Sequence, residues 1–201
     1  MAVRARVDDP KKQVARAACD LVAEGGMEAA TLRRVAARLG TTTGYISHYF
    51  AGKEDLLEAA LTTALDEVSE QVTRAPEPAS LDDWLAMIEK ALPNDAASQR
   101  FWRVLVAFQA VSLTSSRLQS VLRTYSIDGE QRLVSRLGAI LPADVPESEV
   151  QDLARAIWVL IDGVGTTAVT NPGALTVQQQ SIALRGAIGA LIEHTKDGKA
   201  T

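Results

Sequence analysis

The sequence has very few residues that bind metals or form disulfides. One cysteine, Cys19, and two histidines, His48 and His194, occur among its 201 residues. A single cysteine excludes an internal disulfide, and such low cysteine content is typical of a reducing compartment. These side chains cannot build a cysteine- or histidine-rich zinc site. We therefore expect no metal site and no cofactor.

Long apolar runs are also missing. The longest uncharged stretch, residues 163–184, contains Pro172, three glutamines and several threonines, so it is a poor membrane span. Residues 1–13 are polar and basic, which is unlike a secretory signal. The sequence thus predicts a soluble, cytoplasmic protein that does not enter a membrane.

The composition and the apolar spacing favour an all-α fold. Hydrophobic residues make up 47% and charged residues 23% of the chain, as in ordinary globular proteins. Apolar residues recur at spacings of three and four, and strand-like alternation is scarce. Glycine and proline breakers divide the chain into about nine helical runs. These runs are about 9–24, 31–40, 42–49, 53–73, 81–92, 97–113, 116–140, 147–170 and 175–195.

Charge is distributed unevenly along the chain. Residues 1–53 carry nine Lys/Arg and five Asp/Glu, a net charge of +4, whereas residues 54–201 carry twelve and twenty, a net charge of −8. A basic N-terminal part on an acidic body suggests contact with a polyanion. We predict two domains, residues 1–53 and 54–201, joined through the long helical run that starts at Lys53.

Residues 31–50 have the pattern of a helix-turn-helix. Their sequence is T-L-R-R-V-A-A-R-L-G-T-T-T-G-Y-I-S-H-Y-F. Leu32, Val35, Ala36 and Leu39 form one apolar stripe, and Gly40 can take the left-handed conformation that ends a helix. A second short helix follows, with a threonine as its N-terminal cap. Such a second helix fits the DNA major groove.

The outward residues of the second helix suit contact with DNA. Threonine hydroxyls and exposed amides at a helix N-terminus can bind phosphates. Gly44 lets the backbone approach DNA closely, and Tyr45 offers a ring to a thymine methyl group or a sugar. His48 and Tyr49 can donate hydrogen bonds to phosphate oxygens. The alternative is a helical hairpin with an ordinary solvated face.

The N-terminal region closely resembles the DNA-binding domain of TetR-type repressors. The resemblance covers residues 9–61 and includes A-A-C-D-L-V-A-E-G-G, T-L-R-R-V-A-A-R-L-G and T-T-G-Y-I-S-H-Y-F-A-G-K-E-D-L-L-E-A-A-L. Within that family, S-H-Y-F followed by L-L-E-A is most similar to the betaine-synthesis repressors. The resemblance implies phosphate contacts from Thr31, Thr42, Ser47, His48, Tyr49 and Lys53. It places Thr43, Gly44 and Tyr45 nearest to the base edges. Arg4 and Arg6 are candidates for a minor-groove arm or, equally, a solubilising tail.

The body carries the candidate effector site. TetR-type bodies enclose a ligand pocket, so the resemblance makes the body's aromatic residues candidates for lining it, with core packing as the alternative. The candidates are Trp84, Trp102, Phe108, Tyr125, Trp158 and the carboxylate Asp162. Asp162 lies in an apolar helical stretch and must be paired, hydrogen-bonded or protonated there. It could pair with Arg155 or Arg103, or it could balance the charge of a cationic ligand held by aromatic faces. Gln109 stands where betaine repressors often have a second aromatic residue, so a small cation is only the leading candidate.

The last two long runs are rich in glycine and alanine, which lets helices approach closely. In TetR-type proteins the corresponding helices pair with those of a second subunit, so the resemblance implies a two-fold homodimer on a palindromic or pseudo-palindromic operator in double-stranded DNA.

We predict a DNA-binding transcriptional regulator, a repressor that a small-molecule effector releases. The alternative is an effector-independent, nucleoid-associated protein of the same fold, and an activator role is also open. We expect no catalytic residues, because Ser47 and His48 are adjacent on a helix and do not face each other.

Overall fold

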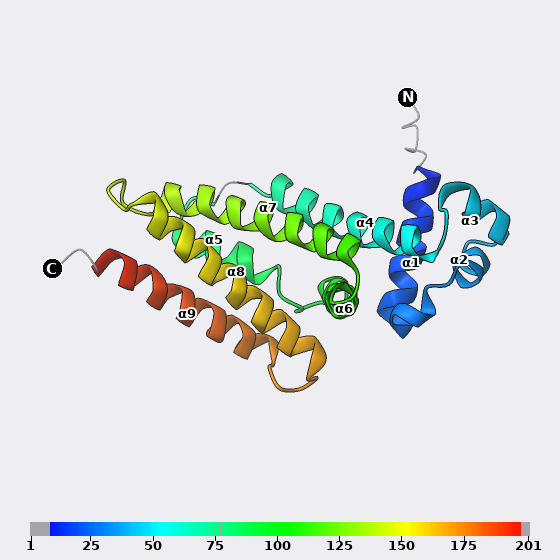
Figure 1. Ribbon diagram of the computed structural model, residues 1–201. Helices are drawn as coiled ribbons and strands as arrows, with labels where there is room; N and C mark the ends of the chain where they lie inside the picture. The colour runs from blue at the N-terminus through cyan, green and yellow to red at the C-terminus, as the bar shows by residue number, and fades with distance from the viewer. Residues whose placement is uncertain (1–8, 77, 198–201) are drawn as a thin grey trace, which may run out of the picture. The chain divides into compact units, whose positions relative to one another are not determined.

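The structure is a computed structural model that describes residues 9–76 and 78–197. Within these residues it contains nine α-helices, one short 3-10 helix and no strand (Figure 1). The α-helices are α1 (Pro10–Gly25), α2 (Leu32–Arg38), α3 (Thr43–Tyr49), α4 (Lys53–Arg74), α5 (Leu81–Glu89), α6 (Ala96–Ser112), α7 (Ser116–Ile140), α8 (Glu147–Thr170) and α9 (Val177–Asp197). The predicted all-α fold is confirmed. The candidate arm residues Arg4 and Arg6 lie outside the described residues.

The helix ends follow local hydrogen bonds. The side chains of Asp9 and Ser80 cap α1 and α5 by accepting from backbone N–H groups. Helix α9 begins two residues later than predicted because Thr176 and Gln179 exchange hydrogen bonds between side chain and backbone, which fixes the start at Val177. Helix α5 ends at Glu89 rather than near residue 92, since the next residues form tighter i→i+3 turns. The sequence did not predict the 3-10 helix Met27–Ala29.

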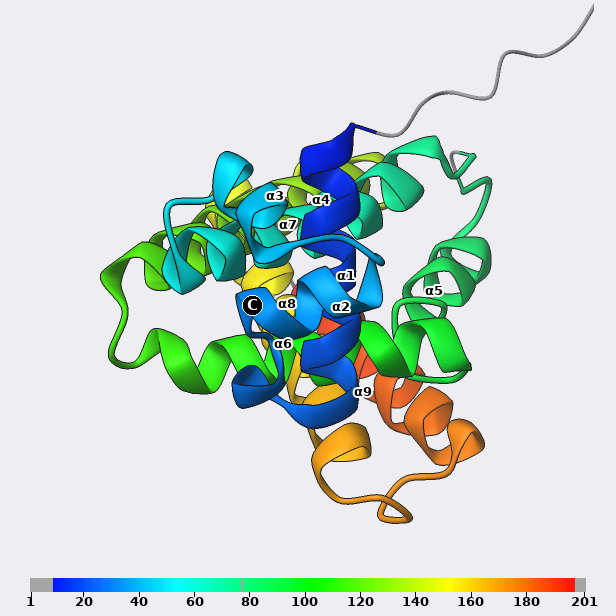
Figure 2. The same cartoon turned by 90° about the vertical axis from the view of Figure 1, so that its right-hand side faces the viewer.

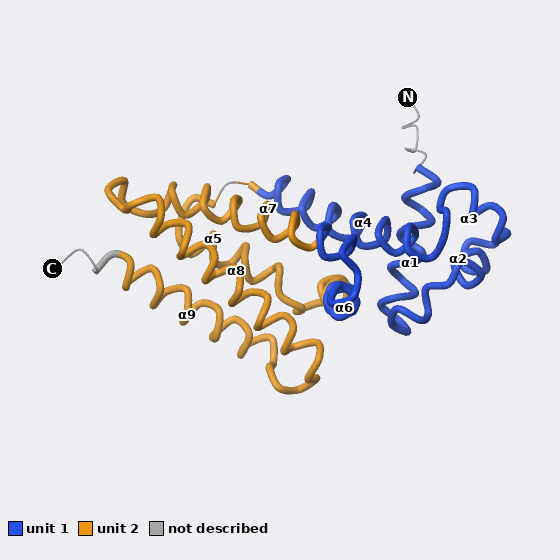
Figure 3. The backbone as a smooth tube through the Cα atoms, in the orientation of Figure 1, with its two compact units in different colours: residues 1–75, 103–121 blue, residues 76–102, 122–201 orange. Residues whose placement is uncertain are grey.

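The chain forms two compact units (Figure 3). The first unit comprises residues 1–75 and 103–121, and the second comprises residues 76–102 and 122–201. All of α4 belongs to the first unit, together with the end of α6 and the first residues of α7. The predicted functional boundary between residues 53 and 54 lies within the first unit and stays a prediction.

In the first unit, α1 packs along α4, and α2 and α3 pack against each other on one side of α1 (Figures 1 and 2). Val14, Leu61 and Ile46 are fully buried in this unit. The Cys19 thiol donates a hydrogen bond of 2.9 Å to the carbonyl oxygen of Ala60, which ties α1 to α4. The short helices α2 and α3 thus rest on a rigid pair of helices.

The second unit is built around an apolar core of α5, α8 and α9 with the end of α7. Trp84, Leu137, Ile157 and Leu184 are completely buried in it. Helix α8 is the one helix among the described residues that is long and apolar enough to cross a membrane by length and composition. Its buried residues, such as Ile157, belong to this core, and 28% of its apolar window is buried.

Candidate nucleic-acid interface

Helices α2 and α3 form the predicted helix-turn-helix. Gly40 has a φ of 64°, the left-handed conformation that glycine adopts most readily, and the Thr41 N–H then bonds to the carbonyl of Ala36 at 2.9 Å. Val35 and Ile46 are fully buried. Burial of Ile46 turns the opposite face of α3 to solvent.

The outer face of α3 carries the residues predicted to meet DNA. The predicted residues that are exposed are Thr42, Thr43, Gly44, Tyr45, Ser47 and His48. Tyr49, Thr31 and Lys53 are partly exposed. The structure therefore brings the predicted base-edge residues together on one accessible surface, which we call the α3 face.

Two threonines cap the helices of the motif. The side-chain oxygens of Thr31 and Thr42 accept hydrogen bonds of 3.2 Å from the N–H groups of Arg34 and Tyr45, respectively. A hydroxyl that accepts one hydrogen bond keeps its own proton for another acceptor. Both caps can thus hold their helix and donate to a phosphate oxygen at the same time.

The aromatic side chains of α3 form a cluster. The ring centroids of Tyr45 and Tyr49 are 5.2 Å apart, and those of His48 and Tyr49 are 5.0 Å apart, both edge to face. A hydrogen bond with Tyr45 raises the pKa of Tyr49 above its ordinary value. The Tyr49 hydroxyl is therefore neutral at pH 7 and can donate to an anion.

Acidic neighbours already pair with two of the basic groups of this surface. Lys53 Nζ lies 3.3 Å from Glu28, and the guanidinium of Arg38 holds both carboxylate oxygens of Glu24 at 2.8 and 2.6 Å. The carboxylate of Glu24 raises the pKa of Arg38 further. Arg33 and Arg34 are exposed on α2. The net charge of +4 counted for this region therefore includes basic side chains that already have acidic partners. A phosphate that binds one of them would have to replace its carboxylate.

The sequence did not predict how the start of α4 is fixed. Asp55 Oδ2 accepts a hydrogen bond of 3.1 Å from the N–H of Ala51, in the turn between α3 and α4. The other oxygen of Asp55 lies 2.9 Å from Arg117 Nη1 at the start of α7. No local pattern could reveal this contact, because the two residues are far apart in the chain.

Three of the predicted effector residues lie in tightly packed positions. Trp84 and Phe108 are completely buried, and Trp102 is 3% exposed. The Trp102 indole N–H donates a 2.7 Å hydrogen bond to the carbonyl of Ala91, and its ring lies where a Cβ on Gly165 would be, 2.2 Å from Cζ2. Trp102 therefore packs in the manner of a core residue.

The other three predicted effector residues lie close together in the second unit. The rings of Tyr125 and Trp158 meet edge to face with centroids 5.4 Å apart. Burial raises the pKa of Tyr125 to about 12, the charge of Arg132 acts against this rise, and the charge of Asp162 adds to it. Asp162 follows Trp158 by one helical turn on α8. We call Tyr125, Trp158 and Asp162 the α7–α8 cluster.

Arg155, one of the two arginines that could pair with Asp162, lies beside other carboxylates. Arg155 lies 3.5 Å from Glu130 and 3.5 Å from Asp152, and its side chain is largely exposed. Arg103 is exposed at the start of the first unit's second segment. Arg155 is thus engaged by Glu130 and Asp152.

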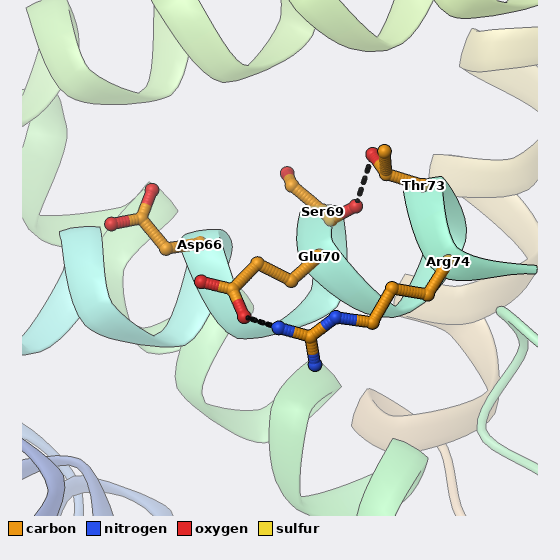
Figure 4. A pocket seen from close by; sticks show the side chains of 5 residues that line it. All are labelled: Asp66, Ser69, Glu70, Thr73 and Arg74. Carbon is orange, nitrogen blue, oxygen red and sulfur yellow. Dashed lines mark hydrogen bonds and ion pairs between the residues drawn. The ribbon is translucent and has the colours of Figure 1, made fainter. Parts of the chain in front are cut away.

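A polar surface pocket lies along α4, and none of the predicted effector residues lines it. It has a volume of about 270 Å³ and is lined by Asp66, Ser69, Glu70, Thr73 and Arg74 (Figure 4). Arg74 and Glu70 form an exposed ion pair at 2.6 Å, one turn apart.

No group of histidine, cysteine or carboxylate side chains within residues 9–76 and 78–197 has the arrangement of a metal site.

The chain matches two protein-family models. Residues 15–60 match the model described as bacterial regulatory proteins, tetR family, and residues 81–193 match the model described as BetI-type transcriptional repressor, C-terminal. The chain is 26% identical over 176 residues to the HTH-type transcriptional regulator BetI of Vibrio campbellii, covering 86% of each chain. It is 29% identical over 157 residues to BetI of Stenotrophomonas maltophilia, covering 77% of this chain and 78% of that protein.

Solved structures of similar fold are also regulators. A transcriptional regulator from Rhodococcus superposes with a TM-score of 0.83 at 25% identity, covering 92% of this chain and 97% of the other. A transcriptional regulator from Saccharomonospora viridis, solved in complex with choline, has a TM-score of 0.73 at 19% identity, covering 92% of this chain and 95% of the other. Both matches cover nearly the whole chain, including α1–α3 and the body.

Proposed function

Because the chain belongs to the TetR family of bacterial regulatory proteins and is a transcriptional regulator, we propose that it is a cytoplasmic repressor that a small molecule releases from its operator. The exposed α3 face over the buried Ile46 carries the proposal. Residues 1–53 serve as the DNA-binding part, and residues 54–201 serve ligand binding and dimerisation. The family consists of regulators rather than enzymes, in keeping with the expected absence of catalytic residues.

The α3 face would enter the major groove. Thr43, Gly44 and Tyr45 lie nearest to the base edges, where short side chains and a bare backbone allow close approach. The phosphate contacts come from residues around them, namely Thr31, Thr42, Ser47, His48, Tyr49 and Lys53. Glu28 would release Lys53 when a phosphate takes its place, because the Glu28 side chain is 93% exposed and weakly held.

A homodimer would present two α3 faces to one side of the duplex. We assign the interface to α8 and α9, whose outer faces carry exposed apolar residues such as Val159 and Ile182, each 63% exposed. Gly163 and Gly186 have no neighbouring atoms within 4 Å of a Cβ position, so a second helix can come close. Two-fold symmetry then requires a palindromic or pseudo-palindromic operator with half-sites about 34–36 Å apart along the axis.

The effector is a small organic cation in this proposal. The α7–α8 cluster supplies aromatic rings and a carboxylate, the groups that bind a quaternary ammonium. The choline complex of the Saccharomonospora viridis relative makes choline the first compound to test. Trp84 and Trp102 are buried in the same unit as this cluster and would support it.

Release would follow a shift between two conformations. The effector must bind the DNA-incompetent state more tightly than the DNA-competent state. A tenfold loss of operator affinity requires about 1.4 kcal/mol of coupling between the two sites.

The DNA-binding part of the proposal can be tested by selecting genomic fragments with the purified full-length chain. We expect a few fragments that share an inverted repeat, at near-physiological salt. Recovery without sequence preference, lost steeply as salt rises, would overturn the proposal and favour the effector-independent, nucleoid-associated alternative. A reporter gene behind a recovered fragment then distinguishes repression from activation.

The effector part can be tested on a recovered fragment by fluorescence anisotropy. We expect choline chloride to release wild-type protein, and its uncharged carbon isostere to release far less. Asp162→Asn should abolish release while leaving DNA affinity unchanged, and Glu149→Gln, an exposed carboxylate on the same helix, should behave as wild type. A fully responsive Asp162→Asn protein would leave Asp162 with a structural role only.

A further inference from the structure

The start of α7 is fastened to the start of α4 by one arginine. Arg117 Nη1 lies 2.9 Å from Asp55 Oδ1, and its Nη2 forms an ion pair with Glu58 Oε2. Asp55 and Glu58 lie three residues apart on α4, so the two carboxylates project from one side of the helix. A planar guanidinium with several N–H donors suits such a pair better than a single point charge.

The ion pairs of Arg117 are held in place on both α7 and α4. Leu118, the next residue on α7, is 5% exposed, and its N–H lies 3.4 Å from the Ser115 hydroxyl that caps the helix. On α4, Glu58 Oε2 is shielded from solvent although the side chain as a whole is 33% exposed, so without the guanidinium this oxygen would lose its counter-ion. Two carboxylates would then face each other without a counter-ion.

The contact reaches the end of the α3 face through Asp55. While Oδ1 meets Arg117, Oδ2 accepts from the Ala51 N–H in the turn between α3 and α4. Arg117 and the Ala51 N–H both lower the pKa of Asp55, so the carboxylate is fully charged at neutral pH. Tyr49 and Lys53, the proposed phosphate contacts, flank this turn.

We propose that Arg117 is a positioning residue for operator recognition, which holds the α3–α4 turn in its DNA-binding geometry through Asp55 and Glu58. This inference rests on the proposed function. Only base-edge contacts carry sequence information, so a displaced α3 loses contacts that the operator offers and unrelated DNA does not. Loss of Arg117 therefore weakens operator binding more than binding to unrelated DNA.

The test compares Arg117→Gln with wild-type protein on an operator fragment and on an unrelated duplex of equal length. We expect the ratio of the two affinities to fall roughly tenfold, the effect of about 1.4 kcal/mol. Arg123→Gln removes an exposed arginine from the same helix and should change neither affinity more than twofold. A fall in the folded fraction lowers both affinities equally, so the ratio separates positioning from stability.

Glu58→Gln tests the same ion pair from its other side and checks the result for Arg117→Gln. It should lower the same ratio, and the double variant Arg117→Gln/Glu58→Gln should lose no more than the weaker-binding single variant, because both changes break one contact. An unchanged ratio in Arg117→Gln and Glu58→Gln, or strictly additive losses, would overturn the inference. If wild-type protein shows no operator preference, the proposed function itself fails, which is a different result.

Discussion

Tyr45 and Tyr49 lie one turn apart on α3 and are assigned different contacts. Their rings meet edge to face, with centroids 5.2 Å apart, but only Tyr45 belongs to the base-edge group. Removing one hydroxyl or one ring therefore tests the two roles separately.

Tyr49→Phe should weaken binding to all DNA sequences by about threefold to tenfold, because one hydrogen bond to a phosphate is lost. Tyr45→Ala should instead change which sequence is preferred. Anisotropy titrations on a set of operator variants measure both effects. Thr62→Ala deletes an exposed hydroxyl outside α3 and should bind as wild type. Wild-type behaviour of both tyrosine variants would contradict the assignment of α3 as the reading helix.

Gly129 makes room for the ring of Trp158. A Cβ on Gly129 would lie 2.0 Å from Cζ3 of the indole, far inside contact distance, although Gly129 is in the middle of α7. The indole must therefore move if any side chain is introduced at this position. This close approach sets the position of Trp158 beside Tyr125 in the α7–α8 cluster.

Gly129→Ala should lower the free energy of unfolding by about 1–3 kcal/mol, because overpacking exceeds the gain in helix propensity. Gly138→Ala on the same helix has nothing within 4 Å of the new Cβ, so it should be neutral or stabilise the protein by up to about 1 kcal/mol. Urea unfolding of both variants measures the difference. Equal stabilities would show that the indole moves freely.

At the scale of elements, an ion-pair network joins α5 to α9. Arg185 Nε and Nη2 hold the two oxygens of Glu89 at 2.7 and 2.8 Å, and Arg185 and Ser181 make further contacts with Asp82 and Glu89, respectively. Arg185, by its hydrogen bonds, lowers the pKa of Glu89 below its ordinary value. The Glu89 side chain is 19% exposed, so solvent screens this pair only in part.

Because the folded-state pKa of Glu89 is lowered, its stabilisation is complete above the unfolded pKa of about 4.3 and is lost as pH falls through the folded value. Wild-type protein should therefore lose stability below about pH 5. Glu89→Gln should be less stable at pH 7 by about 1–3 kcal/mol and should lose less on acidification. Chemical unfolding at pH 7 and pH 4 measures this. Glu193→Gln, an exposed carboxylate on α9, should follow the wild-type pH profile.

Local sequence signals, such as capping residues and turn glycines, predicted where helices begin and end better than they predicted which helices touch. Thr31, Gly40 and Thr42 act through neighbours within a few residues, so the boundaries of α2 and α3 follow from the sequence. Apolar periodicity identifies the buried face of a helix but not what packs against it. The sequence therefore indicated which residues of α3 face outward but not the contact between Arg117 and Asp55.

The same limit applies to the body. Aromatic residues on separate helices are equally compatible with a core and with a ligand site. Trp102 and Trp158 each lie against a glycine on another helix, Gly165 and Gly129, respectively. Neither pairing has a sequence signal, because a glycine within a helix usually has no such role. Only the three-dimensional arrangement separates the α7–α8 cluster from the core residue Trp84.

At the scale of the whole molecule, the proposed function requires two copies of the chain. One α3 face reads one half-site, so specificity for an inverted repeat needs a dimer. The outer faces of α8 and α9 have exposed apolar side chains and small residues, which is the composition of a closely packed helical interface.

Ile182→Glu should convert a dimer of twice 21.5 kDa into monomers, because two charged side chains would be buried near the two-fold axis without partners. Sedimentation equilibrium measures the mass, and operator affinity should fall at least about a hundredfold, since each half-site is then bound alone. Leu113→Glu places the same charge on another exposed apolar residue, 80% exposed at the end of α6, and should remain dimeric. A wild-type monomer, or a dimeric Ile182→Glu protein, would contradict the assigned interface, and only the first result would contradict dimerisation itself.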